Sequence, residues 1–372
     1  MGAASTLRSR IEVGLRRVPI SALRDIVAKR PASGRNIEAL DGIRGLAVLL
    51  VLASQTGAFH LNGHGGVGVW LFFCLSAFLL TMPFAERPER ATDGPTLRRY
   101  AARRLRRIVP AYYFVLAFDF LVLGDVEVAL FAKHLLFLQA DSILWTIPQE
   151  LLFYALLPLL AASHVFVFRR SRPTTVLGLA AIAVAANLAL DASVFAMHGN
   201  GRWMRFYLGI FATGMAFAYA HAWPRLARIV ARPRINRALG ALGLGLLVLL
   251  FITSKHYQLT WFASVPILRD LAVPMGWAYP GSFGVVCSAL IYVTLVCEGR
   301  WIQRLMSCLP LRALGITSYS LYLWHLTVRD ALMGMGVAPG LPLFAATLAV
   351  TYTLSCAIYA FVERPFMQLR SS

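Results

Sequence analysis

The chain has 372 residues, of which 58% are hydrophobic and only 14% are charged. Soluble domains usually carry about 25% charged residues, so the composition argues against a cytosolic globular protein. The formal net charge is +19, from 36 Lys and Arg residues against 17 Asp and Glu residues. Such an excess suggests nucleic-acid binding in a soluble protein, whereas in a membrane protein it orients the chain in the bilayer. We therefore expect membrane lipids, and no nucleic acid, as partners.

Ten apolar runs along the chain are long enough to cross a bilayer core of ~30 Å as helices. The predicted spans cover residues 43–60, 66–83, 108–124, 148–168, 174–191, 204–221, 238–253, 275–297, 316–336 and 341–362. Two shorter apolar pieces, 130–138 and 259–273, are interpreted as interfacial or re-entrant segments. The predicted fold class is an all-α polytopic membrane protein, a bundle of about ten transmembrane helices.

The loop charges test this layout through the positive-inside rule. With the N-terminus in the cytoplasm, 30 of the 36 Lys and Arg residues fall in cytoplasmic segments and six in outer segments. This alternation predicts that both termini are cytoplasmic, in what we expect to be a bacterial cytoplasmic membrane. The predicted organisation is a basic amphipathic N-terminal segment over 1–42, a transmembrane domain over 43–363 and a short cytoplasmic tail over 364–372.

The five cysteines form no pattern typical of a disulfide framework or a zinc site. None belongs to a CxxC pair, and four lie in apolar runs or at their edges. We therefore expect neither a disulfide framework nor a bound metal.

Polar residues at membrane depth are costly, so they are candidates for function. Arg44 and Gln55 are eleven residues apart in the first span, close to three helical turns, which places them on one face about 16 Å apart. Alternatively, Arg44 is an anchor whose side chain extends to the membrane surface. In the following loop, His60 and His64 indicate either a catalytic pair or a polar turn, and two histidines without a carboxylate neighbour are a weak metal signature.

An arginine-rich segment leads into the third predicted span. Arg103, Arg104 and Arg107 are at helix-neighbour spacing, and guanidinium groups suit bidentate phosphate binding. The alternative is a cytoplasmic collar that binds anionic lipids, and we favour this for Arg98 and Arg99.

Three later motifs carry further polar residues. Glu150 follows Pro148 near the start of the fourth span, where a carboxylate is either a helix cap or an acid of a functional site. His325 lies inside the ninth span, where a histidine is often a hydrogen-bonding strut. Glu363 and Arg364 close the last span and suggest a charge pair at the membrane edge.

Taken together, these motifs resemble the acyltransferase-3 family of integral-membrane O-acyltransferases. The resemblance rests on residues 40–47 (LDGIRGLA), 66–79 (GVGVWLFFCLSAFL), 103–110 (RRLRRIVP), 144–154 (LWTIPQELLFY), 318–325 (SYSLYLWH) and 363–365 (ERP). It implies ten helices with both ends cytoplasmic. The implied reaction is transfer of an acyl group, commonly acetyl or succinyl, from cytoplasmic acyl-CoA to a hydroxyl of a sugar, glycolipid or polysaccharide.

The resemblance also implies roles for individual residues. Arg44, Arg104 and Arg107, with Arg103 beside them, would bind acyl-CoA. Glu150 and His325 match motif positions.

Two positions depart from the family pattern: Gln55 stands where the family has the histidine taken to be the base, and Ala77 stands where it usually has glycine. An amide cannot take up a proton at any relevant pH, although it can orient a hydroxyl or a thioester carbonyl. The base would then come from His60 or His64, or from Glu150. We expect direct attack of the acceptor hydroxyl on the thioester, and the alternative is a catalytically inactive homologue that acts as a scaffold or as a lipid or glycan transporter.

Overall fold

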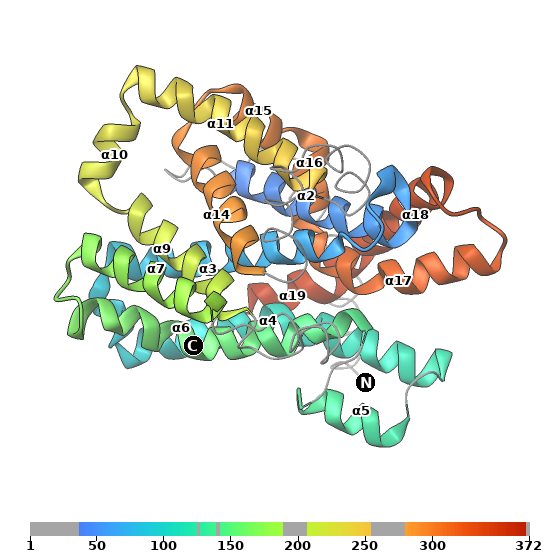
Figure 1. Ribbon diagram of the computed structural model, residues 1–372. Coiled ribbons are helices and arrows are strands. Elements are labelled where there is room, and N and C mark those ends of the chain that lie inside the picture. The colour runs from blue at the N-terminus through green and yellow to red at the C-terminus, as the bar shows by residue number, and fades with distance from the viewer. Residues whose placement is uncertain (1–36, 125–126, 139–141, 189–206, 254–279, 370–372) are drawn as a thin grey trace, which may run out of the picture.

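The computed structural model describes residues 37–124, 127–138, 142–188, 207–253 and 280–369, which form helices and their connections without any strand (Figure 1). The α-helices are α2 (Ile37–Thr56), α3 (Gly65–Glu86), α4 (Gly94–Phe118), α5 (Val128–Leu135), α6 (Thr146–Phe166), α7 (Arg172–Leu188), α9 (Leu208–His221), α10 (Pro224–Val230), α11 (Pro233–Ile252), α14 (Pro280–Val296), α15 (Trp301–Met306), α16 (Leu309–Ile316), α17 (Ser318–Gly334), α18 (Leu341–Ile358) and α19 (Arg364–Gln368). Short 3₁₀ and π turns lie between some of them, at Ala58–His60, Pro88–Ala91, Asp119–Leu123, Ser142–Trp145 and Tyr359–Glu363. The predicted all-α class is confirmed.

Five segments of the described chain are long and apolar enough to cross a membrane. They are Glu38–Thr56, Gly65–Glu86, Ser142–Phe166, Pro233–Ile252 and Leu341–Gln368. Shorter apolar helices lie at Arg172–Leu188, Leu208–His221 and Phe283–Val296. These segments make the chain an integral membrane protein. The number of ten spans and the side on which the termini lie stay predictions.

Helix starts differ most from the sequence-based expectations. The start of the membrane domain predicted at residue 43 falls inside α2, which begins at Ile37. Helix α4 begins at Gly94, well before the span predicted from residue 108, because Asp93 caps it by accepting a hydrogen bond from the Thr96 backbone N at 3.0 Å. A hydropathy pattern does not detect the polar first part of a helix such as α4. An N-cap residue such as Asp93 does mark the position where the helix begins.

Of the two predicted interfacial or re-entrant segments, only one lies within the described residues. Helix α5 occupies most of the piece predicted at 130–138. The piece predicted at 259–273 lies outside the described residues.

Helices α2 and α3 form the centre of the bundle. Within their most apolar windows, 83% and 72% of residues are buried, against 22% for α11 and 28% for the window that contains α18. Apolar residues surround α3 on all sides, as expected for a helix enclosed by others. Helices α11 and α18 therefore leave most of their surface for lipid.

Glycines allow α2 to lie directly against the segment that contains α15 and α16. A Cβ atom at Gly42 would lie 1.6 Å from the carbonyl oxygen of Met306, and one at Gly315 would lie 1.7 Å from the carbonyl oxygen of Asp41. Only glycine permits this approach, as at other close helix contacts in membranes. The contact fixes the end of α2 that carries Arg44.

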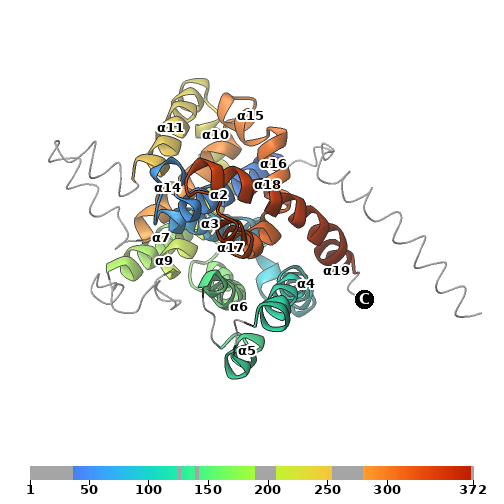
Figure 2. The same cartoon turned by 90° about the vertical axis from the view of Figure 1, so that its right-hand side faces the viewer.

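Helices α4, α5 and α6 lie together on one side of the bundle (Figure 2). Tyrosine side chains connect this group internally and to α17. The Tyr100 hydroxyl donates to the Tyr154 carbonyl at 3.2 Å and joins α4 to α6. The Tyr319 hydroxyl on α17 donates to the Ile108 carbonyl of α4 at 2.9 Å. These bonds hold the helices around a common space.

Candidate active site

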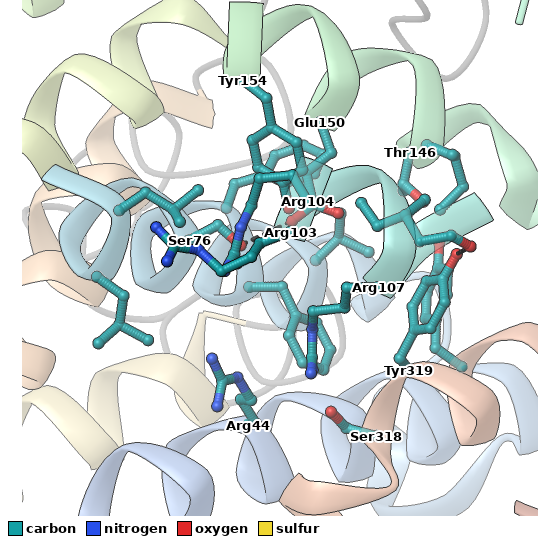
Figure 3. Close-up of a pocket in the computed structure, with 18 of the residues that line it drawn as sticks. Arg44, Ser76, Arg103, Arg104, Arg107, Thr146, Glu150, Tyr154, Ser318 and Tyr319 are labelled. Atoms are coloured by element: carbon teal, nitrogen blue, oxygen red, sulfur yellow. Dashed lines mark hydrogen bonds between the residues drawn. The ribbon is translucent and has the colours of Figure 1, made fainter. Parts of the chain in front are cut away.

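A cavity of about 410 Å³ lies between α2, α3, α4, α6 and α17. Its charged lining residues are five arginines and one glutamate: Arg44, Arg103, Arg104, Arg106, Arg107 and Glu150. Figure 3 shows Arg44 reaching toward this space from α2 and Arg104 and Arg107 from α4. The structure thus brings together all the arginines predicted to bind the donor, and it joins Glu150 to them.

The cavity arginines differ in whether their guanidinium groups already have an ion-pair or hydrogen-bond partner within the protein. Arg44 Nη1 forms an ion pair with Asp41 Oδ1 at 2.7 Å. Arg106 Nη1 donates to the Leu369 carbonyl at 2.6 Å. Arg104 Nε is buried and has no hydrogen-bond partner among the described residues. A buried donor without a partner is costly, so Arg104 favours an anionic ligand in the cavity.

Burial also makes the charged form of Arg104 less stable. Desolvation lowers the pKa of its guanidinium, and the positive charge of Arg107 acts in the same direction. A phosphate brought into the cavity would oppose both effects by direct attraction. The site is therefore built to gain from binding an anion.

Glu150 lies in the cavity and does not cap its helix. Helix α6 begins at Thr146, its N-cap position forms no side-chain cap hydrogen bond, and Glu150 is one turn further on. Ser76 Oγ on α3 donates a hydrogen bond to Glu150 Oε1 at 2.7 Å. Of the two roles that the sequence left open for Glu150, the structure favours an acid of a functional site.

Sequence reasoning missed Ser76 as a site residue. In the sequence Ser76 is one residue of the 66–79 motif, and a serine in an apolar run usually bonds the backbone of its own helix. Its position opposite a carboxylate 74 residues further along the chain is visible only in the fold.

His325 is fully buried on α17 and is not part of the cavity lining. Its Nδ1 lies 2.5 Å from the Tyr322 carbonyl oxygen. A carbonyl can only accept, so Nδ1 carries the proton and Nε2 holds a free lone pair. Within the part of the chain that the structure describes, Nε2 is buried and has no hydrogen-bond partner. The ring packs beside Tyr322, which does line the cavity, with ring centroids 5.6 Å apart.

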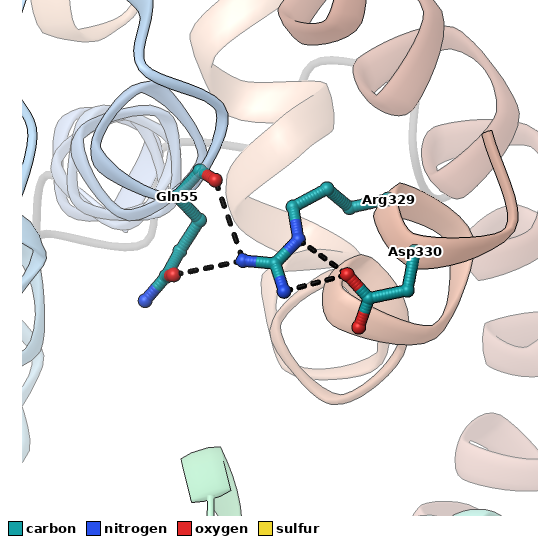
Figure 4. Close-up of polar contacts among 3 residues, drawn as sticks. All are labelled: Gln55, Arg329 and Asp330. Atoms are coloured by element: carbon teal, nitrogen blue, oxygen red, sulfur yellow. Dashed lines mark hydrogen bonds and ion pairs between the residues drawn. The ribbon is translucent and has the colours of Figure 1, made fainter. Parts of the chain in front are cut away.

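Gln55 lies outside the cavity lining, next to Arg329 and Asp330 (Figure 4). Arg329 Nη1 donates to Gln55 Oε1 at 3.1 Å and to the Gln55 carbonyl oxygen at 3.3 Å. Arg329 also pairs with Asp330 at 2.6 Å. The structure therefore does not bring Gln55 together with the arginines around Glu150, although Gln55 and Arg44 are on the same helix.

The two loop histidines also lie apart from the cavity lining. His60 is exposed and has a positive φ of 55°. His64 is buried, and its Nε2 lies 2.7 Å from the Leu250 carbonyl oxygen of α11. Within the part of the chain that the structure describes, no cluster of three or more potential metal ligands occurs.

Glu363 is buried and does not lie exposed at a membrane edge. Its Oε1 accepts a hydrogen bond from Ser320 on α17, and its Oε2 is buried without a partner. Arg107 acts electrostatically on Glu363, and Arg107 Nη1 donates to Met367 Sδ, four residues further on, at 3.4 Å. The last span therefore ends close to the arginines of the cavity.

Comparisons with known proteins agree with the motif-based resemblance. The profile described as an acyltransferase domain (Acyl_transf_3) matches residues 37–360. A protein of Staphylococcus aureus (strain COL) that is named provisionally as an O-acetyltransferase is 24% identical over 373 residues, which cover 89% of this chain and 57% of the relative. O-acetyltransferase OatA of Staphylococcus aureus (strain NCTC 8325 / PS 47) is 24% identical over 371 residues, which cover 90% of this chain and 57% of the relative.

The chain thus spans little more than half the length of these curated relatives. No solved structure matches it. The family profile covers most of the chain, from the first residue of α2 to the turn that follows α18. The protein is accordingly a member of the acyltransferase-3 family.

Proposed function

We propose that the protein is a membrane O-acyltransferase that transfers an acyl group, acetyl or similar, from cytoplasmic acyl-CoA to a hydroxyl of a sugar, glycolipid or cell-envelope glycan. Membership in an acyltransferase family and the names of the relatives support the reaction class. The observation that carries the proposal is the cavity, where five arginines face a single glutamate.

The cavity suits the phosphate-bearing part of a CoA thioester. Arginine forks bind phosphate oxygens bidentately, and five arginines line this cavity. The volume of about 410 Å³ is within the usual range for small-molecule sites. Apolar residues such as Phe72, Leu79 and Leu80 line the rest and provide a surface for the pantetheine arm.

Glu150 is the group that we assign as general base. It is the acidic residue of the cavity lining, and a hydroxyl already lies at hydrogen-bonding distance from its carboxylate in the form of Ser76. A base must lie within about 2.6–3.2 Å of the hydroxyl that it deprotonates. His60, His64 and Gln55 do not line the same space.

The proposed topology follows the distribution of loop charge. Arginine and lysine residues concentrate in the segments assigned to the cytoplasm, so both termini and the donor entrance would lie on that side of a bacterial cytoplasmic membrane. The acyl acceptor would approach from the outer leaflet or the outer surface.

A second candidate function is that of an inactive homologue, acting as a scaffold or as a lipid or glycan transporter. The observation that favours it is Gln55, which cannot act as a base and is held by two contacts from Arg329. The two candidates differ in one measurable respect, because only an acyltransferase releases free CoA.

The experiment measures CoA thiol release from acetyl-CoA by the purified protein in lipid nanodiscs, with a total extract of bacterial envelope glycans as acceptor. Glu150→Gln should lower the rate about 10²-fold or more, the usual contribution of a positioned base. Glu89→Gln, an exposed acid in the Pro88–Ala91 turn, is the matched control and should be unaffected. A Glu150→Gln protein with the wild-type rate would refute the assignment of the base, and no thiol release by any form would favour the inactive homologue.

A further inference from the structure

Ser76 is the hydroxyl on the cavity face of α3. The residues that α3 contributes to the cavity recur every three or four positions, so they form one helix face. These residues are Val69, Phe72, Phe73, Ser76, Leu79 and Leu80. All except Ser76 are apolar. Ser76 is therefore the polar residue on an otherwise apolar face of α3.

Two hydroxyls of the described cavity lining, those of Ser76 and Tyr154, hydrogen-bond to Glu150, and Ser76 is the aliphatic one. Thr146 and Tyr322 both donate to the Ile143 carbonyl oxygen, and Tyr319 donates to the Ile108 carbonyl oxygen. Ser76 instead donates to a carboxylate oxygen at 2.7 Å. A nucleophile within hydrogen-bond reach of a base is the arrangement that covalent acyl transfer requires.

The charges of the cavity favour the same chemistry. Attack by a hydroxyl on a thioester places negative charge on the carbonyl oxygen, and fixed positive groups stabilise that oxyanion. Arg104, which carries a buried Nε without a partner, interacts electrostatically with Glu150. Nucleophile, base and positive charge therefore occupy one space.

We propose that Ser76 is an acyl-carrying residue, so that transfer proceeds in two steps through an ester on its hydroxyl. This inference rests on the proposed function, since it needs acyl-CoA as donor. In the first step the Ser76 Oγ–carbonyl bond forms, the carbonyl–sulfur bond breaks, and Glu150 passes the Ser76 proton to the departing CoA thiolate. In the second step Glu150 takes the proton of the acceptor hydroxyl, which attacks the ester, and returns it to Ser76 Oγ.

The test is isotope exchange between labelled CoA and unlabelled acetyl-CoA on the purified full chain, without any acceptor. A two-step route exchanges label, because the acyl-Ser76 ester reacts back with free CoA, whereas direct transfer does not. Exchange in the wild type, an acetyl group on the Ser76 peptide after acid quenching, and loss of both in Ser76→Ala would support the proposal. Ser76→Cys keeps a nucleophile and should keep exchange.

Further variants and measurements distinguish loss of the acyl-Ser76 step, which we call the relay, from misfolding of the variant and from failure of the proposed function. Ser288→Ala removes a buried serine of α14 whose hydroxyl has no partner, and it should exchange like the wild type. If Ser76→Ala binds CoA with wild-type affinity but does not exchange, misfolding is excluded. Wild-type protein that binds CoA yet shows neither exchange nor adduct, or an adduct on Tyr154 or Ser318, would overturn the relay and leave the proposed function standing. Absence of CoA binding in the wild type would overturn both.

Discussion

Helix α2 lies directly against the segment that holds α15 and α16, and Gly42→Ala tests whether this contact matters. The substitution places a methyl group 1.6 Å from the Met306 carbonyl oxygen, whereas real Cβ atoms essentially never lie closer than 3.0 Å to such an atom. The two segments would have to separate by roughly 1.4 Å, because the obstructing atom belongs to the backbone and cannot rotate away.

The expected cost follows from the energetics of overpacking. Extra atoms in a packed core usually cost about 1–3 kcal/mol. In a chain of this length each kcal/mol lowers the melting temperature by roughly 1.3 °C, so we expect a fall of about 1–4 °C. Since Arg44 lies two residues further along α2 and lines the cavity, the same separation should weaken binding of the donor.

The assay is thermal unfolding in detergent together with titration of CoA. Gly245→Ala is the matched control, because an added Cβ on this glycine of α11 meets nothing within 4 Å. Alanine is also the better helix former by about 1 kcal/mol, so the control should not be destabilised. Equal melting temperatures and equal CoA affinity for Gly42→Ala and wild type would refute the inference that this contact positions Arg44.

Three further predictions concern residues outside the cavity lining. Gln55→Ala should leave CoA affinity within about twofold of wild type, as measured by titration, because Gln55 contacts Arg329 and not the donor site. His325→Asn should retain thiol release and Ser76 labelling, and a loss as large as that of Glu150→Gln would show that His325 is the base instead. Asp93→Ala should lower the melting temperature at neutral pH by removing the cap of α4. Hydrogen bonds from Thr96 lower the pKa of Asp93, so the cap is complete at neutral pH and is lost as the pH falls through that lowered pKa; the difference between variant and wild type should therefore shrink in acid.

Local sequence patterns predicted the all-helical class and several arginines that the structure places around one cavity. Arg104 and Arg107 are three positions apart on one helix, and their spacing alone places them side by side. Their meeting with Arg44 was expected from the family resemblance, and the fold achieves it by packing α2 and α4 around one cavity.

Contacts between distant segments could not be predicted in this way. His64 lies against the Leu250 carbonyl oxygen, 186 residues away, and Gln55 receives Arg329, 274 residues away. A backbone carbonyl such as that of Leu250 looks the same in every helix, and the residues around Arg329 carry no pattern that points to Gln55. Arg44 and Gln55 are about three helical turns apart, which is far enough for Arg44 to line the cavity while Gln55 does not.

The role of Ser76 also could not be predicted from local sequence. A hydroxyl in an apolar helix is ambiguous in sequence, since it can bond its own backbone as Thr213 and Thr294 do. Only the packing of α3 against α6 places Ser76 opposite Glu150. The distinction between a structural and a reactive serine therefore depends on tertiary structure.

The measurement that tests the central claim most directly is the affinity of purified protein for CoA in three forms: wild type, Arg104→Ala/Arg107→Ala and Arg98→Ala/Arg99→Ala. The last pair removes the same charge from exposed positions of α4 outside the cavity lining. A hydrogen bond to a charged group is worth about 1.5–3 kcal/mol, which corresponds to roughly 10- to 150-fold in affinity for each arginine. We predict a loss of at least about 10-fold for the cavity pair and little change for the exposed pair. Equal affinities for the wild type and the cavity pair would contradict the assignment of this cavity as the donor site.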